Sequence, residues 1–246
     1  MRFGEDNMEA IKTFIITTWQ DFLQCFIEAA RYKMYLEGLL NTLIIALGAC
    51  LIGIIIGIVV TAIRIAPKNG VIMRVLDGIC RVYVTVIRGT PVVLQLFICY
   101  FVLLKSLKFV GNGIPIAAIT FGINSGAYMA EILRGGITAV DYGQTEAGRS
   151  LGLSWMATFT KIVLPQAIKN AIPTMFNEFI TLIKETSVAG YVGIVDLTKI
   201  QSYVTTQTMN LYMPLFIIAA MYLILVVGLQ QVQKLLERRF GKANER

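Results

Sequence analysis

The stretch LLNTLIIALGACLIGIIIGIVVTAI, from Leu39 to Ile63, contains 25 residues and no charged side chain. About 20 apolar residues are enough for a helix to cross the hydrocarbon core of a bilayer. The whole chain of 246 residues is 56% hydrophobic and 15% charged, with a mean hydropathy of +0.69. An ordinary soluble domain carries about 25% charged residues. The sequence therefore predicts an all-α integral membrane protein.

Four more stretches are apolar and long enough for a transmembrane helix. They are Val82–Leu104, Ile114–Leu133, Ile168–Ala189 and Leu211–Leu229. The third of these is the weakest, because Lys169 and several other polar residues interrupt it. Polar side chains are costly in lipid, so we expect this helix to be buried inside the bundle. The sequence thus predicts five core transmembrane helices.

The distribution of basic residues predicts the orientation of these helices. Five crossings place the chain ends on opposite sides, and cytoplasmic segments of membrane proteins carry an excess of Lys and Arg. If the C-terminus is cytoplasmic, thirteen basic residues lie inside and seven outside. We therefore expect the N-terminus outside and the C-terminus in the cytoplasm. The net charge of +7 then belongs to cytoplasmic loops, and we expect no nucleic acid partner.

The segment 1–37 precedes the first long apolar stretch and has a different pattern. Between residues 8 and 37, apolar side chains such as Phe14 and Trp19 recur at spacings of three and four. This pattern is typical of an amphipathic helix lying in the membrane interface. An imperfect sixth crossing is the alternative, although charged residues within the segment count against it. The predicted organisation is this segment, a transmembrane domain at 38–240 and a tail at 241–246.

A cytoplasmic loop at 141–167 is expected between the third and fourth crossings, with the sequence DYGQTEAGRSLGLSWMATFTKIVLPQA. It is longer than a simple connection between helices requires, and long ordered loops are usually functional. Its apolar residues recur every four positions: Ala147, Leu151 and Trp155. Glu146 and Arg149 are three apart, so a first short helix presents one apolar and one charged face.

Local signals predict a turn and a second short helix in the same loop. Gly152 supplies a stop, and Ser154 can cap the helix that follows. Pro165 is expected to end this second helix before the next crossing. The sequence predicts a rigid helix–turn–helix outside the membrane, with a surface of small residues that suits a groove on another protein.

The loop also resembles a known motif. Glu146-Ala147-Gly148, Gly152 and the stretch Ile162 to Pro165 have the spacing of the EAA loop, EAA-x3-G-x9-I-x-LP, of ABC importer permeases. One departure is Gly148, where the family usually has Ala. Three other stretches are similar to the polar amino acid branch of that family, which includes histidine, glutamine and arginine permeases: RGTPVVLQLF from Arg88, NSGAYMAEILRGGI from Asn124 and NEFITLIKETSVAG from Asn177. The resemblance covers about residues 38–240.

The resemblance implies the transmembrane domain of a type I ABC importer in a bacterial cytoplasmic membrane. The loop would form a coupling helix that sits in a cleft of a separate ATPase subunit. The implied coupling residues are Glu146, Ala147, Gly148, Arg149, Leu151, Gly152, Ile162, Leu164 and Pro165. The implied partners are two ATPase subunits, an extracytoplasmic substrate-binding protein and an amino acid substrate.

The chain itself carries no GxxxxGK[ST] phosphate-binding motif. We therefore expect no cofactor in this chain, with ATP and Mg bound by the ATPase partner. Five helices do not easily enclose a path alone, so a two-fold dimer is expected. The second permease is either another copy of this chain or a paralogue.

Polar residues inside the predicted helices are candidates for a substrate path. They are Gln95, Asn124, Ser125, Tyr128, Asn177, Glu178, Thr181 and Glu185. Spacings of three and four place those on each helix along one face. The alternative is that they bond helices together or pair internally, as Glu131 could with Arg134 and Lys184 with Glu178. An excess of embedded carboxylates favours a substrate with an ammonium group, a basic or neutral polar amino acid.

Two other classes of function compete with the importer. An ATP-independent secondary transporter or channel would predict inverted repeats or broken central helices, and it leaves the cytoplasmic loop unexplained. A membrane-embedded enzyme needs a nucleophile and a base, and the sequence contains no histidine and no HExxH or GxSxG motif. The four cysteines have no CxxC spacing, so we expect neither a metal site nor a catalytic site.

Overall fold

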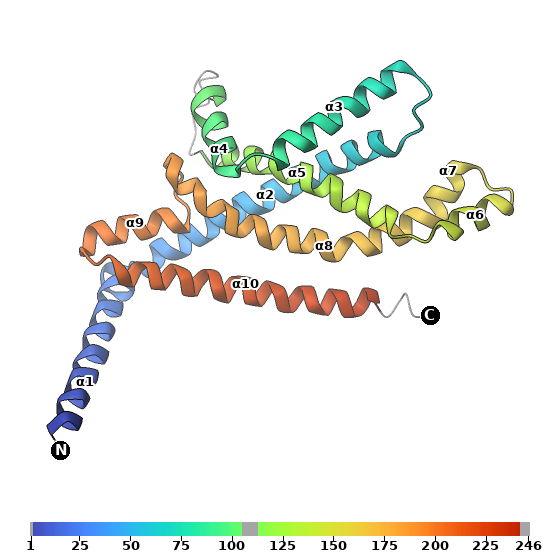
Figure 1. Ribbon diagram of the computed structural model, residues 1–246. Helices are drawn as coiled ribbons and strands as arrows, with labels where there is room; N and C mark the ends of the chain where they lie inside the picture. Colours follow the sequence, from blue (N-terminus) through green and yellow to red (C-terminus); the bar gives the residue numbers. More distant parts are fainter. Residues whose placement is uncertain (1, 105–112, 242–246) are drawn as a thin grey trace. The chain divides into compact units, whose positions relative to one another are not determined.

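The computed structural model describes residues 2–104 and 113–241, and within these ranges every regular element is a helix (Figure 1). The α-helices are α1 (Arg2–Phe22), α2 (Tyr32–Ile65), α3 (Val71–Arg88), α4 (Val92–Phe97), α5 (Ile114–Thr138), α6 (Tyr142–Ser150), α7 (Trp155–Thr158), α8 (Leu164–Glu185), α9 (Leu197–Thr208) and α10 (Tyr212–Gly241). Short π-helical turns span Leu23–Ile27, Ile98–Leu104 and Phe159–Val163, and 3-10 turns span Glu28–Ala30 and Thr186–Val192.

Three of the described helices are long and apolar enough to cross a membrane. They are α2, α5 and the part of α10 from Tyr212 to Leu235. A fourth span results if α3 and α4 are taken together as one broken crossing. The predicted crossing at 168–189 coincides largely with α8, whose polar residues keep it outside this set. The count of five crossings stays a prediction.

The second predicted crossing, Val82–Leu104, is divided into two helices at Pro91. The α3 helix ends at Arg88, and α4 leaves it at an angle of 106°. Between them Pro91 has an extended conformation, with ψ at 134°. Proline has no amide hydrogen to continue the helical bonds, and it disfavours the helical conformation of the residue before it, Thr90. The chain therefore turns here, between two apolar segments.

The predicted helix over residues 8–37 is also interrupted. Ala29 and Ala30 have φ values of 51° and 53°, in the left-handed region that alanine rarely adopts. The α1 helix ends before this turn, and α2 begins after it at Tyr32. Residues 32–37 thus belong to the first long apolar helix. Apolar side chains of α1 such as Phe14 and Trp19 are exposed.

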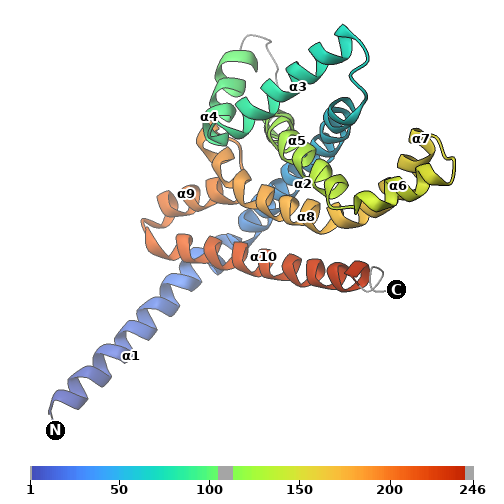
Figure 2. The ribbon, with the colours of Figure 1, turned by 45° about the vertical axis from the view of Figure 1, so that its right-hand side comes forward.

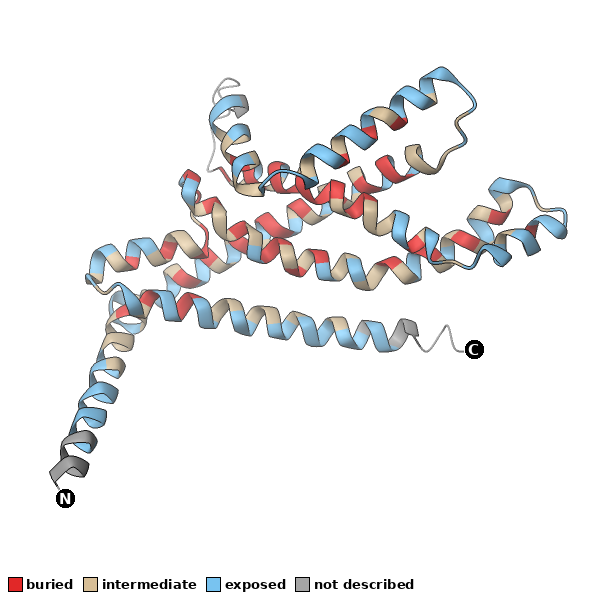
Figure 3. Ribbon diagram, viewed as in Figure 1, coloured by how far each residue is buried: buried red, intermediate tan, exposed pale blue. Residues whose placement is uncertain are grey.

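The chain divides into two compact units, residues 1–43 with 187–225 and residues 44–186 with 226–246. In the second unit α5 is the central helix, and buried residues follow it along much of its length (Figure 3). Glycines on α2 allow α5 to approach closely. A Cβ atom at Gly53 would lie 2.9 Å from the Cβ of Ser125, and one at Gly57 would lie 2.6 Å from the Cβ of Met129.

Gly57→Ala is expected to destabilise the protein, because the added methyl group has no space beside Met129. Overpacking of this kind costs about 1–3 kcal/mol. A Cβ atom at Gly78 on α3 would meet nothing within 4 Å, so Gly78→Ala is the matched control and should be neutral or stabilising. Thermal melting in detergent measures both. Equal melting temperatures for the two variants would contradict the close packing of α2 on α5.

The first unit has its own core, which contains Tyr35, Leu197, Val204 and Ile217. The α9 helix is capped by Asp196, a fully buried residue whose Oδ1 accepts a hydrogen bond of 2.7 Å from the Lys199 amide. Burial raises the pKa of Asp196 from 3.8 to about 6. This residue lies outside the candidate membrane spans.

The raised pKa of Asp196 predicts a dependence of stability on pH. The native state keeps the proton that the unfolded chain loses near its lower pKa, so the free energy of unfolding falls as the pH rises through this window. Above the folded pKa of about 6 the ionised carboxylate costs about 3 kcal/mol. Asp196→Asn should therefore gain stability relative to wild type as the pH rises from about 4 to 7. Melting curves that stay parallel across this range would contradict the expectation.

Candidate functional site

The predicted cytoplasmic loop forms two short helices, α6 and α7, which lie beyond the ends of α5 and α8 (Figures 1 and 2). Asp141 begins α6, and its Oδ1 accepts a hydrogen bond of 2.6 Å from the Gly143 amide. Gly152 has a φ of 80°, a left-handed conformation that glycine adopts without strain. Ser154 caps α7 by accepting a bond of 3.2 Å from the Ala157 amide. The predicted stop at Gly152 and cap at Ser154 are confirmed.

The prediction that Pro165 ends the second short helix is wrong. The α7 helix, the π-helical turn Phe159–Val163 and α8 follow one another without a break, and Pro165 lies in the first turn of α8. A proline lacks the amide hydrogen of a regular helical bond. The π-helical turn already interrupts the regular bonding pattern just before it, so the helix can continue. As a result, α7 is joined directly to α8.

The nine predicted coupling residues do not share one surface. Most are exposed: Glu146, Ala147, Arg149, Leu151, Gly152 and Pro165. Ile162 and Leu164 are half-buried, and Gly148 is buried. A Cβ atom at Gly148 would lie 2.7 Å from the Cγ2 of Thr158 and 3.0 Å from the Cδ1 of Ile162. Gly148 therefore allows α6 to pack against the second helix of the loop, instead of adding to the outer surface.

The outer surface of the loop combines charge with large apolar side chains. Arg149 donates a hydrogen bond of 2.8 Å to the Leu153 carbonyl. Glu146 takes part in none of the ion pairs found in residues 2–104 and 113–241. Leu151 is 80% exposed, and Met156, which the motif does not include, is exposed as well. Its signal in the sequence is its position just after the Ser154 cap. An exposed apolar surface of this kind is typical of a protein contact.

Two of the predicted path residues, Gln95 and Asn124, contact each other. The Asn124 side-chain amide donates to the Gln95 carbonyl oxygen at 2.9 Å. Gln95 in turn donates to the Ile87 carbonyl and to the Thr90 hydroxyl, both at 2.8 Å. Gln95 therefore braces the break between α3 and α4 and fixes that break to α5.

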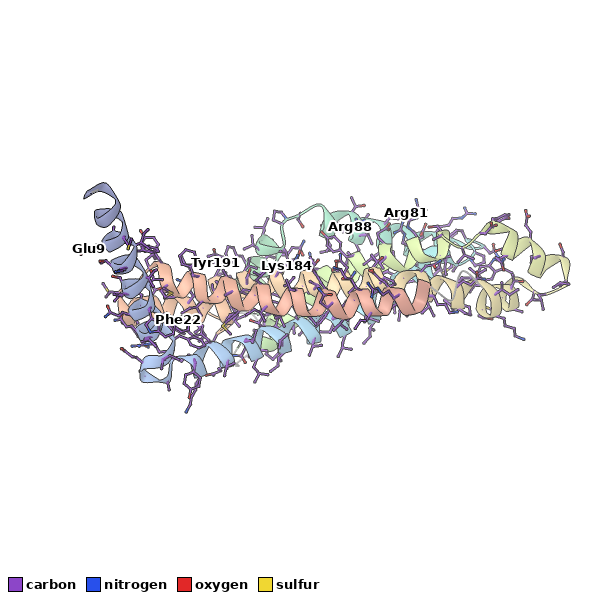
Figure 4. The ribbon with its side chains drawn as sticks, turned by 90° about the horizontal axis from the view of Figure 1, so that it is seen from below. Glu9, Phe22, Arg81, Arg88, Lys184 and Tyr191 are labelled. Atoms are coloured by element: carbon purple, nitrogen blue, oxygen red, sulfur yellow. The ribbon has the colours of Figure 1, made fainter. Side chains whose placement is uncertain are left out.

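A second pair joins α5 and α8. The Ser125 hydroxyl donates to Oε1 of Glu178 at 3.2 Å, and Glu178 is 9% exposed. The alternative partner, Lys184, is exposed and is labelled near the end of α8 in Figure 4. A buried carboxyl group held by one hydroxyl has unused capacity to accept hydrogen bonds.

Other residues of the predicted path are arranged around these pairs. Thr181 donates to the Asn177 carbonyl at 3.1 Å, and Glu185 is half-buried one turn further along α8. The Arg88 guanidinium lies 5.2 Å from the centre of the Tyr128 ring, a distance at which a cation is attracted to an aromatic face. Arg88 is thus a neighbour of the path that the predicted path residues do not include, and its signal in the sequence is the RGTP stretch at the helix break.

Glu131 does not join the path. It pairs with Arg134 at 2.7 Å and also with Arg64 of α2. The internal pairing considered for Glu131 is confirmed. Two cations on one carboxylate tie the ends of α2 and α5 together, so Glu131 has a structural role near the coupling loop. Among the described residues no group of three or more His, Cys, Asp or Glu side chains could hold a metal ion.

Comparison with known protein families shows which family the chain belongs to. Residues 62–242 match the family described as binding-protein-dependent transport system inner membrane component. The chain belongs to this family. It is therefore the membrane permease of an ABC importer, as the EAA loop indicated. Helices α3 and α4 form a broken helix, which is a feature expected of an ATP-independent secondary transporter. The family match excludes that alternative.

The permease is similar to proteins named for amino acid transport. It is 38% identical over 210 residues to the arginine transport system permease protein ArtQ of Bacillus subtilis, covering 85% of this chain and 93% of that protein. It is 36% identical over 205 residues to a putative glutamine transport system permease protein GlnP of Rickettsia felis, covering 82% and 91%. The L-cystine permease TcyB of Bacillus subtilis is 32% identical over 238 residues, covering 96% and 97%.

Solved structures agree on the fold. The crystal structure of an amino acid ABC transporter with histidines contains a chain that matches the permease with a TM-score of 0.80 and 33% identity, covering 87% of this chain and 98% of that one. The MetNI methionine ABC transporter matches with a TM-score of 0.67 at 19% identity, covering 87% and 99%. The predicted fold class, the transmembrane domain of an ABC importer, is confirmed.

Proposed function

We propose that the permease carries polar amino acids into the cytoplasm, with basic amino acids as the preferred class. The relatives named for arginine, glutamine and L-cystine support an amino acid substrate. The position of Glu178 supports a cationic one, because a buried carboxyl group favours a ligand with an ammonium or guanidinium group. Arg88 beside Tyr128 provides a positive group for the carboxylate that every amino acid carries.

The observation that carries the proposal is the continuous helical connection between the loop and the path. The α7 helix passes through the π-helical turn into α8, and α8 carries Glu178. A displacement of α7 by a partner therefore moves α8 as well, because a packed helix transmits rigid-body motion. This connection gives the exposed loop a mechanical route to the polar residues, which is the role expected of a coupling helix.

The proposal includes the partner subunits of this permease. Two ATPase subunits bind ATP and Mg and contact α6 and α7, and the permease itself supplies binding and movement without a catalytic residue. A second permease, either another copy of this chain or a paralogue, completes the path. An extracytoplasmic binding protein delivers the amino acid to the side opposite α6 and α7. In this orientation the N-terminus is outside and the C-terminus is cytoplasmic, in a bacterial inner or plasma membrane.

Reconstitution tests the proposal. The permease is purified with its ATPase subunit, placed in proteoliposomes and supplied with the cognate binding protein. Uptake of radiolabelled arginine, lysine, glutamine and cystine is then measured with and without enclosed ATP. We expect ATP-dependent uptake that is fastest for the basic amino acids. Uptake that continues without ATP hydrolysis would overturn the function, and a preference for glutamate or aspartate would overturn the proposed substrate class.

The orientation is tested separately by labelling. A cysteine placed at the exposed Leu151 should react with a membrane-impermeant maleimide only after the cytoplasmic side is opened. A cysteine placed at the exposed Met209, between α9 and α10, should react from the outside of intact cells. Labelling of both positions from the same side would contradict the proposed topology.

A further inference from the structure

Helix α1 has one apolar and one polar face, and both are exposed. Successive residues of a helix are rotated by about 100°, which places five large apolar side chains on one side of α1. Each of them is between 58% and 70% exposed: Met8, Ile11, Phe14, Ile15 and Trp19. The residues of the opposite side are Glu9, Thr13, Thr17 and Gln20, with Ile16 at its edge. A helix with two such faces is stable at the boundary between water and an apolar medium.

The direction of α1 differs from that of a membrane-spanning helix. The first part of α10, up to residue 225, belongs to the same compact unit as α1, and α10 is a candidate span from Tyr212 to Leu235. Figures 1 and 4 show α1 running across the direction of α10, with Phe22 near the corner between the two helices and Glu9 towards the other end of α1. A helix that runs across a spanning helix lies along the plane of the membrane.

The apolar face of α1 is turned toward the start of the α10 span. The two helices border an open hollow of about 430 Å³. Its lining consists of Phe14, Ile15, Thr18, Trp19, Phe22 and Met213. Met213 lies in the first turn of α10, so the hollow is at the level where this span begins. Acyl chains beneath α1 suit these walls, because a hydrocarbon chain needs no hydrogen bond there.

The turn between α1 and α2 supports the same placement. Ala29 and Ala30 are both left-handed, which costs free energy for residues other than glycine. Arg31 holds the turn, because its guanidinium donates to the Gln24 carbonyl at 2.6 Å and to Oε1 of Gln207 in α9 at 3.4 Å. The α2 helix has 34 residues, and about 20 are enough to span a bilayer. A straight extension of α2 through α1 would therefore carry the apolar face of α1 into water.

We propose that α1 lies in the headgroup region of the leaflet in which α10 begins, with its apolar face on the acyl chains of the lipids. Water covers Glu9 and Gln20 on the other face, and Trp19 lies at the depth that tryptophan favours in a bilayer. The strained turn sets the angle between α1 and α2. The lipid surface is thus the partner of α1, and this contact does not depend on which amino acid is transported.

Tryptophan fluorescence tests the placement of α1. The chain contains two tryptophans, Trp19 and Trp155, so Trp155→Phe leaves Trp19 as the reporter. The full-length variant is placed in nanodiscs of phosphatidylcholine brominated at successive acyl positions, and the quenching gives the depth of the ring. We expect Trp19 about 5–10 Å below the headgroup boundary. Met8→Trp, with Trp19→Phe added, should report the same depth. In a spanning helix these two positions would differ by about 16 Å in depth.

Two more single-tryptophan variants, both with Trp19→Phe and Trp155→Phe, calibrate the measurement. Leu223→Trp lies in the middle of the α10 span at a position that is 63% exposed, and it should be quenched most by deep bromine atoms. Gln20→Trp on the polar face should be quenched mainly by iodide in the water. Different depths at positions 8 and 19 would overturn the proposal in favour of a sixth crossing. Quenching of Leu223→Trp without quenching at 8 or 19 would show that a protein covers the face, and would overturn it as well.

A pair of charge variants tests the apolar face itself. Ile15→Asp places a carboxylate among the acyl chains, so Trp19 should lose quenching by bromine and gain quenching by iodide. Thr17→Asp adds the same charge on the polar face and should change neither. Both positions are exposed, so neither variant depends on repacking of the core. Equal quenching of Trp19 in the two variants would contradict contact of this face with lipid.

Discussion

Glu146→Lys is expected to lower ATP-driven uptake by about 100-fold, because a reversed charge at a protein contact costs several kcal/mol. Glu146 is exposed on α6 and belongs to no ion pair among the described residues. Its carboxylate is therefore available to a partner subunit. The measurement is uptake in proteoliposomes, together with the amount of ATPase subunit that copurifies with the permease.

The same substitution elsewhere provides the control. Glu237 is exposed on α10, and Glu237→Lys changes the net charge of the chain by the same amount. We expect Glu237→Lys to keep uptake and copurification near wild type. If Glu146→Lys behaves like Glu237→Lys in both measurements, the α6 surface is not the contact with the ATPase. Loss of uptake with normal copurification would still place Glu146 in the coupling step.

Glu178→Gln is expected to lower the uptake of basic amino acids about 10- to 100-fold, the usual range for a hydrogen bond to a charged group. Glutamine has nearly the same shape and can still accept the hydrogen bond from Ser125. The change therefore removes the carboxyl group and keeps the packing of α5 on α8. Uptake of glutamine should fall much less, because its side chain carries no positive charge. Competition between radiolabelled arginine and glutamine measures this difference directly.

Three further variants separate the possible causes. Ser125→Ala removes the hydroxyl group and leaves the carboxyl group, so a small effect on arginine uptake is expected. Glu185→Gln changes the next carboxyl group along α8 and should also alter the preference for cations. Glu37→Gln, at an exposed position near the start of α2, should leave selectivity unchanged. Equal loss of arginine and glutamine uptake in Glu178→Gln would indicate a structural role for Glu178 and count against the cation site.

Several features of this permease follow from local patterns in the chain. The apolar stretch from Leu39 forms α2, since any run of that length and composition is stable in lipid only as a helix. Gly152 and Ser154 form the turn and the cap in the loop, because left-handed backbone and helix capping depend on the residue itself. The spacing of the EAA motif also led to the correct family, because the motif describes a short structure formed by residues that are close together in the chain.

Other features depend on partners that are distant in the sequence. The burial of Gly148 results from Thr158 and Ile162 packing over it, and no motif states which side of a short helix is covered. Pro165 stands inside a continuous helix because the π-helical turn before it absorbs the disruption. The break before Pro91 separates two helices of similar composition, so hydropathy alone predicts a single helix there.

The polar residues show the same division most clearly. Composition and spacing identify Gln95, Asn124, Ser125 and Glu178 as unusual within apolar helices, because each costs free energy in lipid wherever it points. Which of them meet is set by the packing of α5 against α4 and α8, which brings Ser125 to Glu178 and Asn124 to Gln95. A single sequence shows which polar groups cost free energy in lipid. The hydrogen-bond partner of each group is determined only when the helices pack together.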